Sequence, residues 1–152
     1  MLGGWSMAII REAGKDDLFA LLNLYTQLHN NALPEDSISL QQTWFDIMDD
    51  KNHHIIVATE NCVIISSCVI VIVQNLTHNQ RPYALIENVI TDEAHRKQGL
   101  ATACLDYAKQ TAIKRGCYKI MLLTGSKNQS TLNFYREAGY NSADKTAFVQ
   151  WL

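Results

Sequence analysis

The second half of the chain places a strand, a long helix and another strand in direct succession. Residues 83–91 and 118–124 are rich in apolar, β-branched and aromatic side chains, which favours strands. Residues 100–115 carry apolar side chains at helical spacing, and Gly116 then marks the end of the helix. Strands connected through such a helix lie parallel in one sheet, because the connection has to cross back over the sheet. This unit restricts the chain to folds that contain a parallel crossover.

The first half of the chain predicts a strand followed by two helices. Residues 8–12 have a strand-like pattern, and apolar residues recur at helical spacing over 18–28, with Asp16 as the expected cap. Ser39 and Gln42 have the spacing of a capping box at the start of a second helix. The apolar face expected for this second helix consists of Leu40, Trp44, Ile47 and Met48.

A hairpin in the middle of the chain and two elements at its end complete the predicted order. Residues 54–59 and 63–73 are rich in Val and Ile and are separated by three residues, so we expect them to pair antiparallel. A short helix that begins at Asn128 or Ser130 precedes a last strand at 147–152. The order β-α-α-β-β-β-α-β-α-β predicts an α+β fold, with helices packed on a mixed sheet.

Length and composition favour one domain, expected to span residues 7–152. The sequence has 152 residues, of which 47% are hydrophobic, enough for one sizeable core. Residues 1–6 lack the features of a secretory signal, and we interpret them as an added leader before a native start at Met7. The longest apolar run, 63–73, is far shorter than the roughly 20 residues of a membrane helix, so we expect no membrane partner.

Charge and cysteine usage exclude further function classes. The formal net charge of −2 and a pI near 6.2 do not predict the basic face that a nucleic-acid partner requires. The histidine pair His53-His54 has no cysteine or carboxylate at ligand spacing, so we expect no metal site. The cysteines lack Cys-x-x-Cys spacing and lie in apolar or helical stretches, which is typical of reduced core thiols and fits a cytoplasmic protein. They are Cys62, Cys68, Cys104 and Cys117.

The segment 96–101 lies between a predicted strand and the first turn of the long helix, where an anion can bind. Unpaired N–H groups and the helix dipole attract phosphate oxygens, and Gly99 lets the backbone approach them. Arg96 and Lys97 add positive charge beside this turn. By itself, Gly99 is equally compatible with a simple tight turn. The Walker and dinucleotide patterns are both absent, because the residues that define them are missing.

The same segment resembles a known family motif. Arg96-x-x-Gly99-x-Ala101 is similar to the R/Q-x-x-G-x-G/A acetyl-CoA pyrophosphate motif of the GNAT acetyltransferases, and a strand precedes it as in that family. The resemblance implies the GNAT fold, a mixed central sheet of about six or seven strands flanked by about four helices in three layers. It also implies acetyl-CoA as co-substrate. The cofactor-binding residues that it implies are Val89, Ile90, Thr91, Arg96, Lys97, Gln98, Gly99, Leu100, Ala101, Thr102 and Asn128.

A second match follows at the distance found in the family. Asn128 and residues 134–140 resemble the signature N-x-x-A-x-x-F-Y-x-x-x-G-F, with Thr131 in place of its alanine and Tyr140 in place of its last phenylalanine. The resemblance implies that Asn128 holds the cofactor, although an ordinary helix cap explains this residue equally well. It also implies that the backbone of 89–91 pairs with the pantetheine arm and that the Ile90 N–H polarises the thioester carbonyl.

Two residues match catalytic positions of the family. Glu87 corresponds to a glutamate that acts as general base through ordered water, while a salt-bridged carboxylate at a strand edge is the alternative. Tyr135 corresponds to the general acid that protonates the departing thiolate, while simple aromatic packing is the alternative. We expect only one of Phe134 and Tyr135 to pack, because adjacent helical positions point in different directions.

The resemblance implies N-acetylation of a primary amine by direct attack in a ternary complex. The candidate acceptors are an amino sugar, an aminoglycoside, a polyamine or an aminoalkylphosphonate, and a homodimer is an open alternative to a monomer. A protein or peptide amine is a second class of acceptor. A non-catalytic CoA-binding or metabolite-sensing module is a further alternative, against which the joint presence of Glu87 and Tyr135 argues. The acidic residues near the second helix attract a cationic amine or simply face solvent. They are Asp36, Asp46, Asp49 and Asp50.

Overall fold

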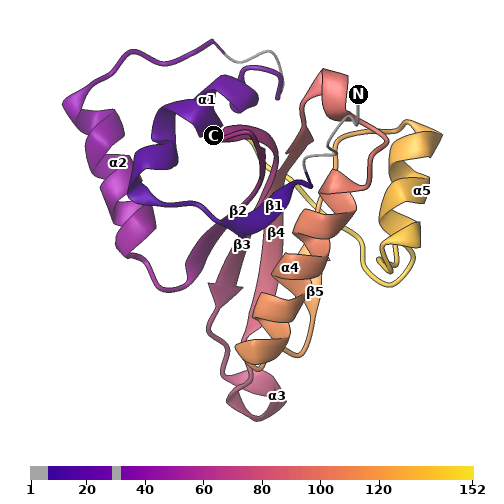
Figure 1. Cartoon of the computed structure of the whole chain (residues 1–152). Helices are drawn as coiled ribbons and strands as arrows, with labels where there is room; N and C mark the ends of the chain where they lie inside the picture. The colour runs from indigo at the N-terminus through magenta and orange to yellow at the C-terminus, as the bar shows by residue number, and fades with distance from the viewer. Residues whose placement is uncertain (1–6, 29–31) are drawn as a thin grey trace.

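The computed structural model describes residues 7–28 and 32–152. The leader that we inferred at residues 1–6 therefore lies outside the described residues. In the part described, a central sheet separates two layers of helices, as Figure 1 shows. Helices α1 (Leu18–Tyr25) and α2 (Ile38–Asp49) lie on one face of this sheet, and α4 (Leu100–Lys114) and α5 (Gln129–Glu137) lie on the other. This confirms the α+β class and the three layers.

The sheet is mixed and follows the order of the chain. Its five strands are β1 (Ile9–Glu12), β2 (His53–Glu60), β3 (Val63–Val73), β4 (Tyr83–Thr91) and β5 (Ile120–Leu122). The first four strands pair antiparallel, and β5 pairs with β4 in parallel through α4. Both the predicted hairpin and the predicted crossover are therefore confirmed. The smaller elements are the 3-10 turns η1 (Lys15–Asp17) and η2 (Glu93–His95) and the short α3 (Thr77–Gln80).

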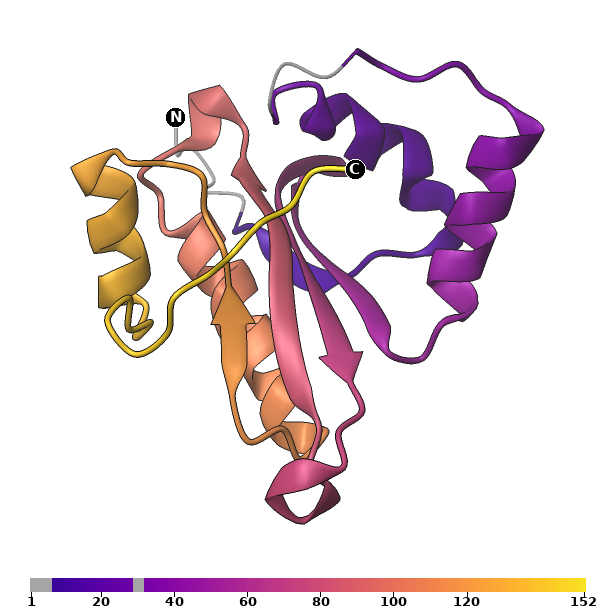
Figure 2. The same cartoon turned by 180° about the vertical axis from the view of Figure 1, so that it is seen from behind.

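The prediction of a strand at 147–152, and with it a sheet of six or seven strands, is wrong for this structure. No strand follows α5, and Figure 2 shows the end of the chain as an extended loop. Phe148 and Trp151 are each 92% exposed. A strand needs a partner along its length, and the neighbouring edge strand, β5, has only three residues to offer. A local β-forming pattern alone does not supply that partner.

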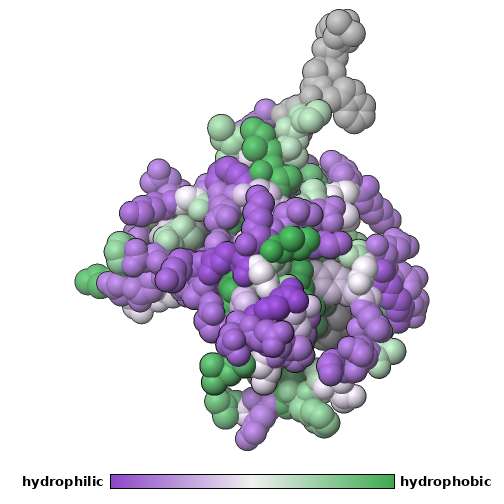
Figure 3. Space-filling model, turned by 90° about the horizontal axis from the view of Figure 1, so that it is seen from below, coloured by the Kyte–Doolittle hydropathy of each residue, from purple (hydrophilic) through white to green (hydrophobic). Residues whose placement is uncertain are grey.

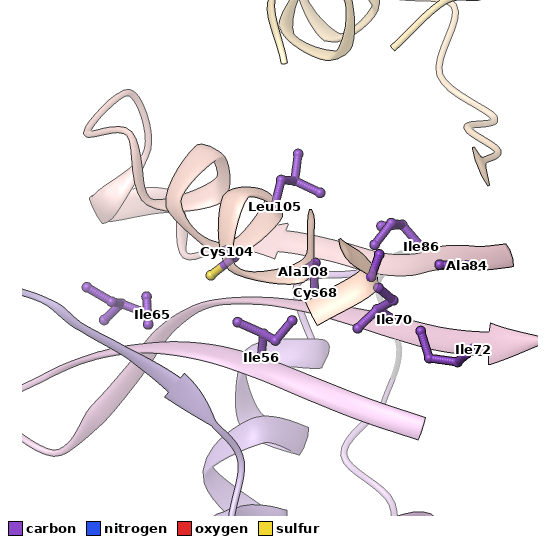
Figure 4. Close-up of a cluster of buried hydrophobic side chains, with 12 residues drawn as sticks. Ile56, Ile65, Cys68, Ile70, Ile72, Ala84, Ile86, Cys104, Leu105 and Ala108 are labelled. Atoms are coloured by element: carbon purple, nitrogen blue, oxygen red, sulfur yellow. The ribbon is translucent and has the colours of Figure 1, made fainter. Parts of the chain in front are cut away.

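Each face of the sheet buries its own apolar cluster. On the α4 face, Ile56 and Ile65 of the sheet lie in one cluster with Cys104 of α4, whose side chain is on the side of the helix that faces the strands, as Figure 4 shows. On the opposite face, Trp44 of α2 and Leu21 of α1 pack against the strands. A central sheet that is covered on both sides in this way has few positions where a polar side chain meets water, which explains the long apolar run in β3.

The expectation that all four cysteines are core thiols is only partly right. Cys68 and Cys104 are buried in the α4-face cluster and Cys117 is half-buried, but Cys62 is exposed. Asn61 and Cys62 form the turn between β2 and β3, with φ values of 49° and 64°. This left-handed pair is the backbone that a tight hairpin requires, and it turns Cys62 outward.

Neither predicted helix cap is found at its predicted residue. Asp17, not Asp16, stands at the cap position of α1, but its side chain makes no capping hydrogen bond to that helix. Its carboxylate accepts the Gly14 N–H at 2.7 Å across η1, and it also accepts Arg11 Nη2 at 2.9 Å. Ser37, two residues before Ser39, caps α2 by accepting the Leu40 N–H at 3.1 Å. The competing caps are close neighbours in sequence, and the direction in which the chain enters each helix selects between them.

Among the described residues, no helix has both the length and the apolar character that are required to cross a bilayer. The face seen in Figure 3 is mainly hydrophilic, with apolar residues in separate patches.

Replacement of Asp17 should destabilise the fold, whereas the same change at Asp16 should not. Asp17→Asn weakens the contacts to Gly14 and Arg11, which we expect to lower the free energy of unfolding by about 1 kcal/mol. Arg11 holds the pKa of Asp17 below its usual value, so this stability is present above the ordinary carboxylate pKa and is lost as pH falls through the lowered one. Urea titration of both variants at pH 7 and pH 3 tests this. Equal stability of the two variants at pH 7 would contradict it.

Candidate functional site

The two parallel strands of the crossover separate partway along their length. β4 pairs with β5 only from Ala84 to Ile86, although β4 itself continues to Thr91. Beyond Ile86 the edge of β4 that faces β5 has no partner strand in the described chain. Peptide groups on such an edge can pair with an extended ligand in the manner of an added strand. The residues predicted to hold the pantetheine arm, 89–91, lie on this free edge.

A bulge in β4 begins where this edge becomes free. Ser67 of β3 faces Ile90 and Val69 faces Glu87, so Asn88 and Val89 together occupy the space opposite Cys68. Asn88 has a φ of 49°, in the left-handed region that a residue with a side chain seldom adopts. A bulge of this kind bends the strand and redirects its peptide groups. The distortion therefore lies at the position where the reacting groups would meet.

Backbone alternation decides which peptide groups point into the gap between β4 and β5. The Ile90 carbonyl accepts Ser66 Oγ at 2.9 Å, and the Asp92 N–H donates to the Ile65 carbonyl at 2.9 Å, so both groups face β3. Since alternate residues of a strand point their peptide groups to the same side, those of Val89 and Thr91 face the gap. This geometry favours Val89 and Thr91, rather than Ile90, as the residues that contact a ligand in the gap.

The start of α4 has the backbone geometry expected of the predicted anion cradle. Lys97 and Gly99 both have left-handed backbone, with φ values of 61° and 79°. The first backbone hydrogen bond of the helix runs from the Ala103 N–H to the Gly99 carbonyl at 2.9 Å. The N–H groups of residues 100–102 thus have no acceptor within the helix and are available to an anion. A Cβ atom added at Gly99 would meet no heavy atom of the described protein within 4 Å beyond its chain neighbours, so the space next to this residue is open.

The charged side chains of the cradle are exposed. Arg96 reaches back to the Thr91 carbonyl at 3.4 Å and lies 3.8 Å from Glu93. Lys97 and Gln98 are exposed next to it. An ion pair of this length on the surface contributes little stability, so Arg96 can exchange Glu93 for a phosphate at small cost.

Asn128 has the helix-cap role that was one of its two predicted explanations. Its side-chain oxygen accepts the Ser130 N–H at 2.9 Å at the start of α5. The amide nitrogen of the same side chain has no partner among the described residues, so the cap leaves a donor for a cofactor.

Glu87 lies on the α1 face of the sheet. It pairs with Val69, whose side chain belongs to the cluster beneath α1 and α2, and residues directly opposite one another share a face. Glu87 is exposed, and within residues 7–28 and 32–152 its carboxylate makes neither a salt bridge nor a hydrogen bond. Glu87 is therefore not the salt-bridged carboxylate that was the alternative explanation for this residue.

Tyr135 approaches from the opposite face. It packs with Phe134 and Tyr140 against the α4-face cluster, with ring centroids 5.0 Å and 6.2 Å away. The expectation that only one of Phe134 and Tyr135 packs is wrong, because α5 lies along the sheet so that both rings are half-buried. Burial raises the pKa of Tyr135 above its usual value, so its hydroxyl keeps its proton at neutral pH.

Sequence reasoning missed three polar residues on the α1 face. The side chains of Ser67 and Asn88 lie beside the hydroxyl of Tyr25, which is the last residue of α1. Tyr25 lies within the apolar helical stretch predicted at 18–28, and Ser67 lies within the apolar run at 63–73. A serine inside an otherwise continuous apolar strand was the signal that could have indicated a polar site.

No group of three or more potential ligands that could hold a metal ion occurs in the described part of the chain. The candidate site consists of a free strand edge, the open first turn of α4 and an exposed carboxylate. Such features suit the class of proteins that bind an extended, anionic ligand.

Comparison with known proteins agrees with this class. The chain matches the model of the acetyltransferase (GNAT) family over residues 17–140. A protein of Agrobacterium tumefaciens str. C58 that is assigned as an acetyltransferase is 34% identical, with a TM-score of 0.87 over 94% of this chain and 99% of that one. A transcriptional regulator from Bacillus halodurans C-125 is 26% identical, with a TM-score of 0.84 over 95% and 99%.

A more distant structure shares the fold and contains the cofactor. An aminoglycoside N-acetyltransferase in complex with CoA is 16% identical, with a TM-score of 0.81 over 99% of both chains. No match was found among curated proteins. The chain belongs to the acetyltransferase (GNAT) family, whose members use acetyl-CoA, and it has the fold and domain of an acyltransferase.

A side chain at Gly99 should block the cradle without unfolding the protein. Asparagine tolerates left-handed backbone, so Gly99→Asn should keep the turn while its side chain enters the open space. We expect the Kd for CoA, measured by isothermal titration, to rise roughly 10-fold or more. Gly116→Asn is the matched control, because Gly116 has a φ of 74° at the other end of α4 and equally open surroundings. Equal CoA affinity in both variants would refute the cradle.

Proposed function

We propose that the protein transfers the acetyl group of acetyl-CoA to a primary amine of a small molecule, by direct attack in a ternary complex. The observation that carries this proposal is the free edge of β4, which leads from an unpaired carboxylate on one face to the cradle at the start of α4. A donor placed along this edge would present its thioester at the bulge, next to Glu87.

In this proposal the cofactor binds through backbone groups. The peptide groups of Val89 and Thr91 pair with the pantetheine arm, and the free N–H groups that begin at Lys97 bind the diphosphate. The Asn128 side-chain amide donates to the cofactor from the opposite side of the gap. When bound, acetyl-CoA supplies the activated acyl group, and the residues of this chain orient it and manage the protons.

Glu87 is the proposed base. An alkylamine has a pKa near ~10 and must lose a proton before it can attack a carbonyl carbon. The amine nitrogen forms the new C–N bond, its extra proton passes to Glu87 directly or through water, and the C–S bond breaks. Glu87 suits this task because it is exposed and makes no salt bridge within the described residues.

Tyr135 is the proposed acid. The sulfur that leaves carries a negative charge and needs a proton, since a thiol has a pKa of roughly 8.5. Burial raises the pKa of Tyr135 above its usual value, so the tyrosine holds a proton that it can give to the sulfur at neutral pH. Tyr135 belongs to the half-buried aromatic group that faces the sheet from α5.

The proposed acceptor is an amine carried on a sugar, and both the site and structures of the same fold bear on this choice. One solved structure of this fold is an aminoglycoside N-acetyltransferase, which favours amines carried on sugars. The acidic residues near α2 offer weaker support, because Asp36 and Asp46 are exposed and already accept glutamine side chains. A surface hollow of about 680 Å³ beside α2 contains no residue of β4, α4 or α5, so we do not place the acceptor there.

Substitution at the two proposed catalytic positions should separate chemistry from binding. Glu87→Gln and Tyr135→Phe should each lower kcat by about 10²-fold or more and leave the Kd for CoA unchanged. Thiol release over a panel of amines gives kcat, and isothermal titration gives the Kd. Glu137→Gln and Tyr107→Phe are the controls, since they alter an exposed carboxylate on α5 and a partly buried ring on α4 that belong to neither proposed catalytic position.

Two results would count against this proposal. Wild-type protein that binds CoA but releases no thiol with any amine would instead favour a CoA-sensing module. Loss of folding stability in parallel with turnover would mean that Glu87 and Tyr135 have structural roles.

A further inference from the structure

Two buried hydroxyl groups on the α1 face lack hydrogen-bond partners. Tyr25 Oη and Ser67 Oγ are both shielded from solvent, and neither meets the geometry of a full hydrogen bond with a described residue. Ser67 and Asn88 lie close enough to the Tyr25 hydroxyl to form only weak hydrogen bonds with it, which oppose the rise of its pKa. Ser67 is completely buried in the middle of β3, and Tyr25 reaches it from the end of α1. Buried polar groups without partners are rare in folded proteins and each lowers stability, so their presence requires a cause.

These hydroxyls lie beside the proposed base and the bulge. Ser67 faces Ile90 across the β3–β4 pair, and two positions along β3 Val69 faces Glu87. Val69 and Ile90 both belong to the cluster beneath α1, which places Ser67 and Glu87 on the same face of the sheet. The Asn88 side chain also lies next to the Tyr25 hydroxyl. Polar atoms from α1, β3 and β4 therefore meet at one point.

The neighbouring serine shows that the sheet does not force this arrangement. Ser66, whose side chain lies on the opposite face, donates to the Ile90 carbonyl at 2.9 Å and lies 2.8 Å from Thr91 Oγ1. The hydroxyls of Ser66 and Ser67 are equally buried, yet only the first is satisfied by the protein. The hydroxyls on the α1 face therefore keep hydrogen-bonding capacity that a group from outside the chain can use.

The position of Tyr25 is held by a tether to the end of β4. Gln27, two residues further on, donates to Asp92 at 2.7 Å and accepts the Glu93 N–H at 3.0 Å. Asp92 follows directly after β4, so this tether fixes the end of α1 against the strand that carries the bulge. Burial also raises the pKa of Tyr25 to about 12, which keeps its hydroxyl neutral.

We propose, on the basis of the acetyltransferase function above, that Tyr25 and Ser67 are positioning residues that hold the amino group of the acceptor. Their hydroxyl oxygens accept the N–H groups of the acceptor, while Glu87 on the same face receives the proton that the nitrogen loses. An amino group offers two or three donors to neighbouring oxygens, which matches the chemistry of this cluster. The pocket thus recognises the nitrogen and leaves the rest of the acceptor to be selected by other residues.

This proposal makes an unusual prediction for stability, which needs no substrate. Tyr25→Phe keeps the ring in its apolar surroundings and removes only an unpaired hydroxyl, and Ser67→Ala does the same on β3. Both variants should melt at the wild-type temperature or above it. Ser66→Ala, which removes a paired hydroxyl one residue away, should melt lower. If Tyr25→Phe and Ser67→Ala lose as much stability as Ser66→Ala, these hydroxyls are structural and the proposal is overturned.

Steady-state kinetics then test the role in binding the amine. The amine probes are sisomicin, glucosamine 6-phosphate, spermidine and 2-aminoethylphosphonate, each with saturating acetyl-CoA. For the probe that wild-type protein acetylates best, Tyr25→Phe and Ser67→Ala should raise KM roughly 10-fold or more, while the Kd for CoA stays within about twofold. Tyr107→Phe on α4 is the control and should leave both constants unchanged.

Failure of this proposal is distinct from failure of the proposed function. Acetylation by Tyr25→Phe and Ser67→Ala with the KM of wild-type protein overturns the positioning role and leaves the acetyltransferase function intact. If wild-type protein releases no thiol with any of the four amines, the proposed function is overturned, and the positioning role that depends on it falls too. The melting temperatures of the variants do not change this outcome.

Discussion

The separation of β4 from β5 is the constraint on which the rest of the site depends. The two strands pair over three residues at one end, and α4 connects them across the α4 face of the sheet. Because β5 stops early, the far end of β4 keeps an edge without a strand, and the same connection places the start of α4 beside that end. A strand edge and a helix start are the two backbone features that bind extended and anionic groups. One topological choice thus produces both halves of the proposed cofactor site.

Unfavourable backbone conformations and unpaired polar groups lie near the gap between β4 and β5. Asn88 and Lys97 adopt left-handed conformations although neither is glycine, and Tyr25 and Ser67 leave hydroxyls unsatisfied. Each of these features lowers stability by an amount on the order of 1 kcal/mol, and packing elsewhere has to offset it. The two apolar clusters on the faces of the sheet supply that packing. Stability is therefore concentrated in the core of the sheet, while the end of β4 is arranged for binding.

Elements with a strong local period could be predicted from the sequence, and those that depend on distant partners could not. The boundaries of β4 and the start of α4 agree with prediction, since the alternation in the strand and the glycine before the helix are local signals. The segment 147–152 has an equally good local pattern but lacks a partner. The cluster of Tyr25 and Ser67 was missed for a related reason, because its two residues are far apart in sequence and meet only after β3 and α1 have packed. Periodicity identifies a face, but it does not show what lies opposite.

The two candidate proton-transfer groups lie on opposite faces of one sheet. Glu87 shares the α1 face with the hydroxyl cluster, and Tyr135 packs on the α4 face with the helix that starts at the cradle. A donor that enters between β4 and β5 would therefore carry its acyl group toward α1 and its sulfur toward α5. This arrangement separates the proton that leaves the nitrogen from the proton that reaches the sulfur, so that neither group can neutralise the other directly. In the proposed reaction, acid and base can then act in one step without exchanging roles, because the sheet keeps the two groups on opposite sides of the reacting atoms.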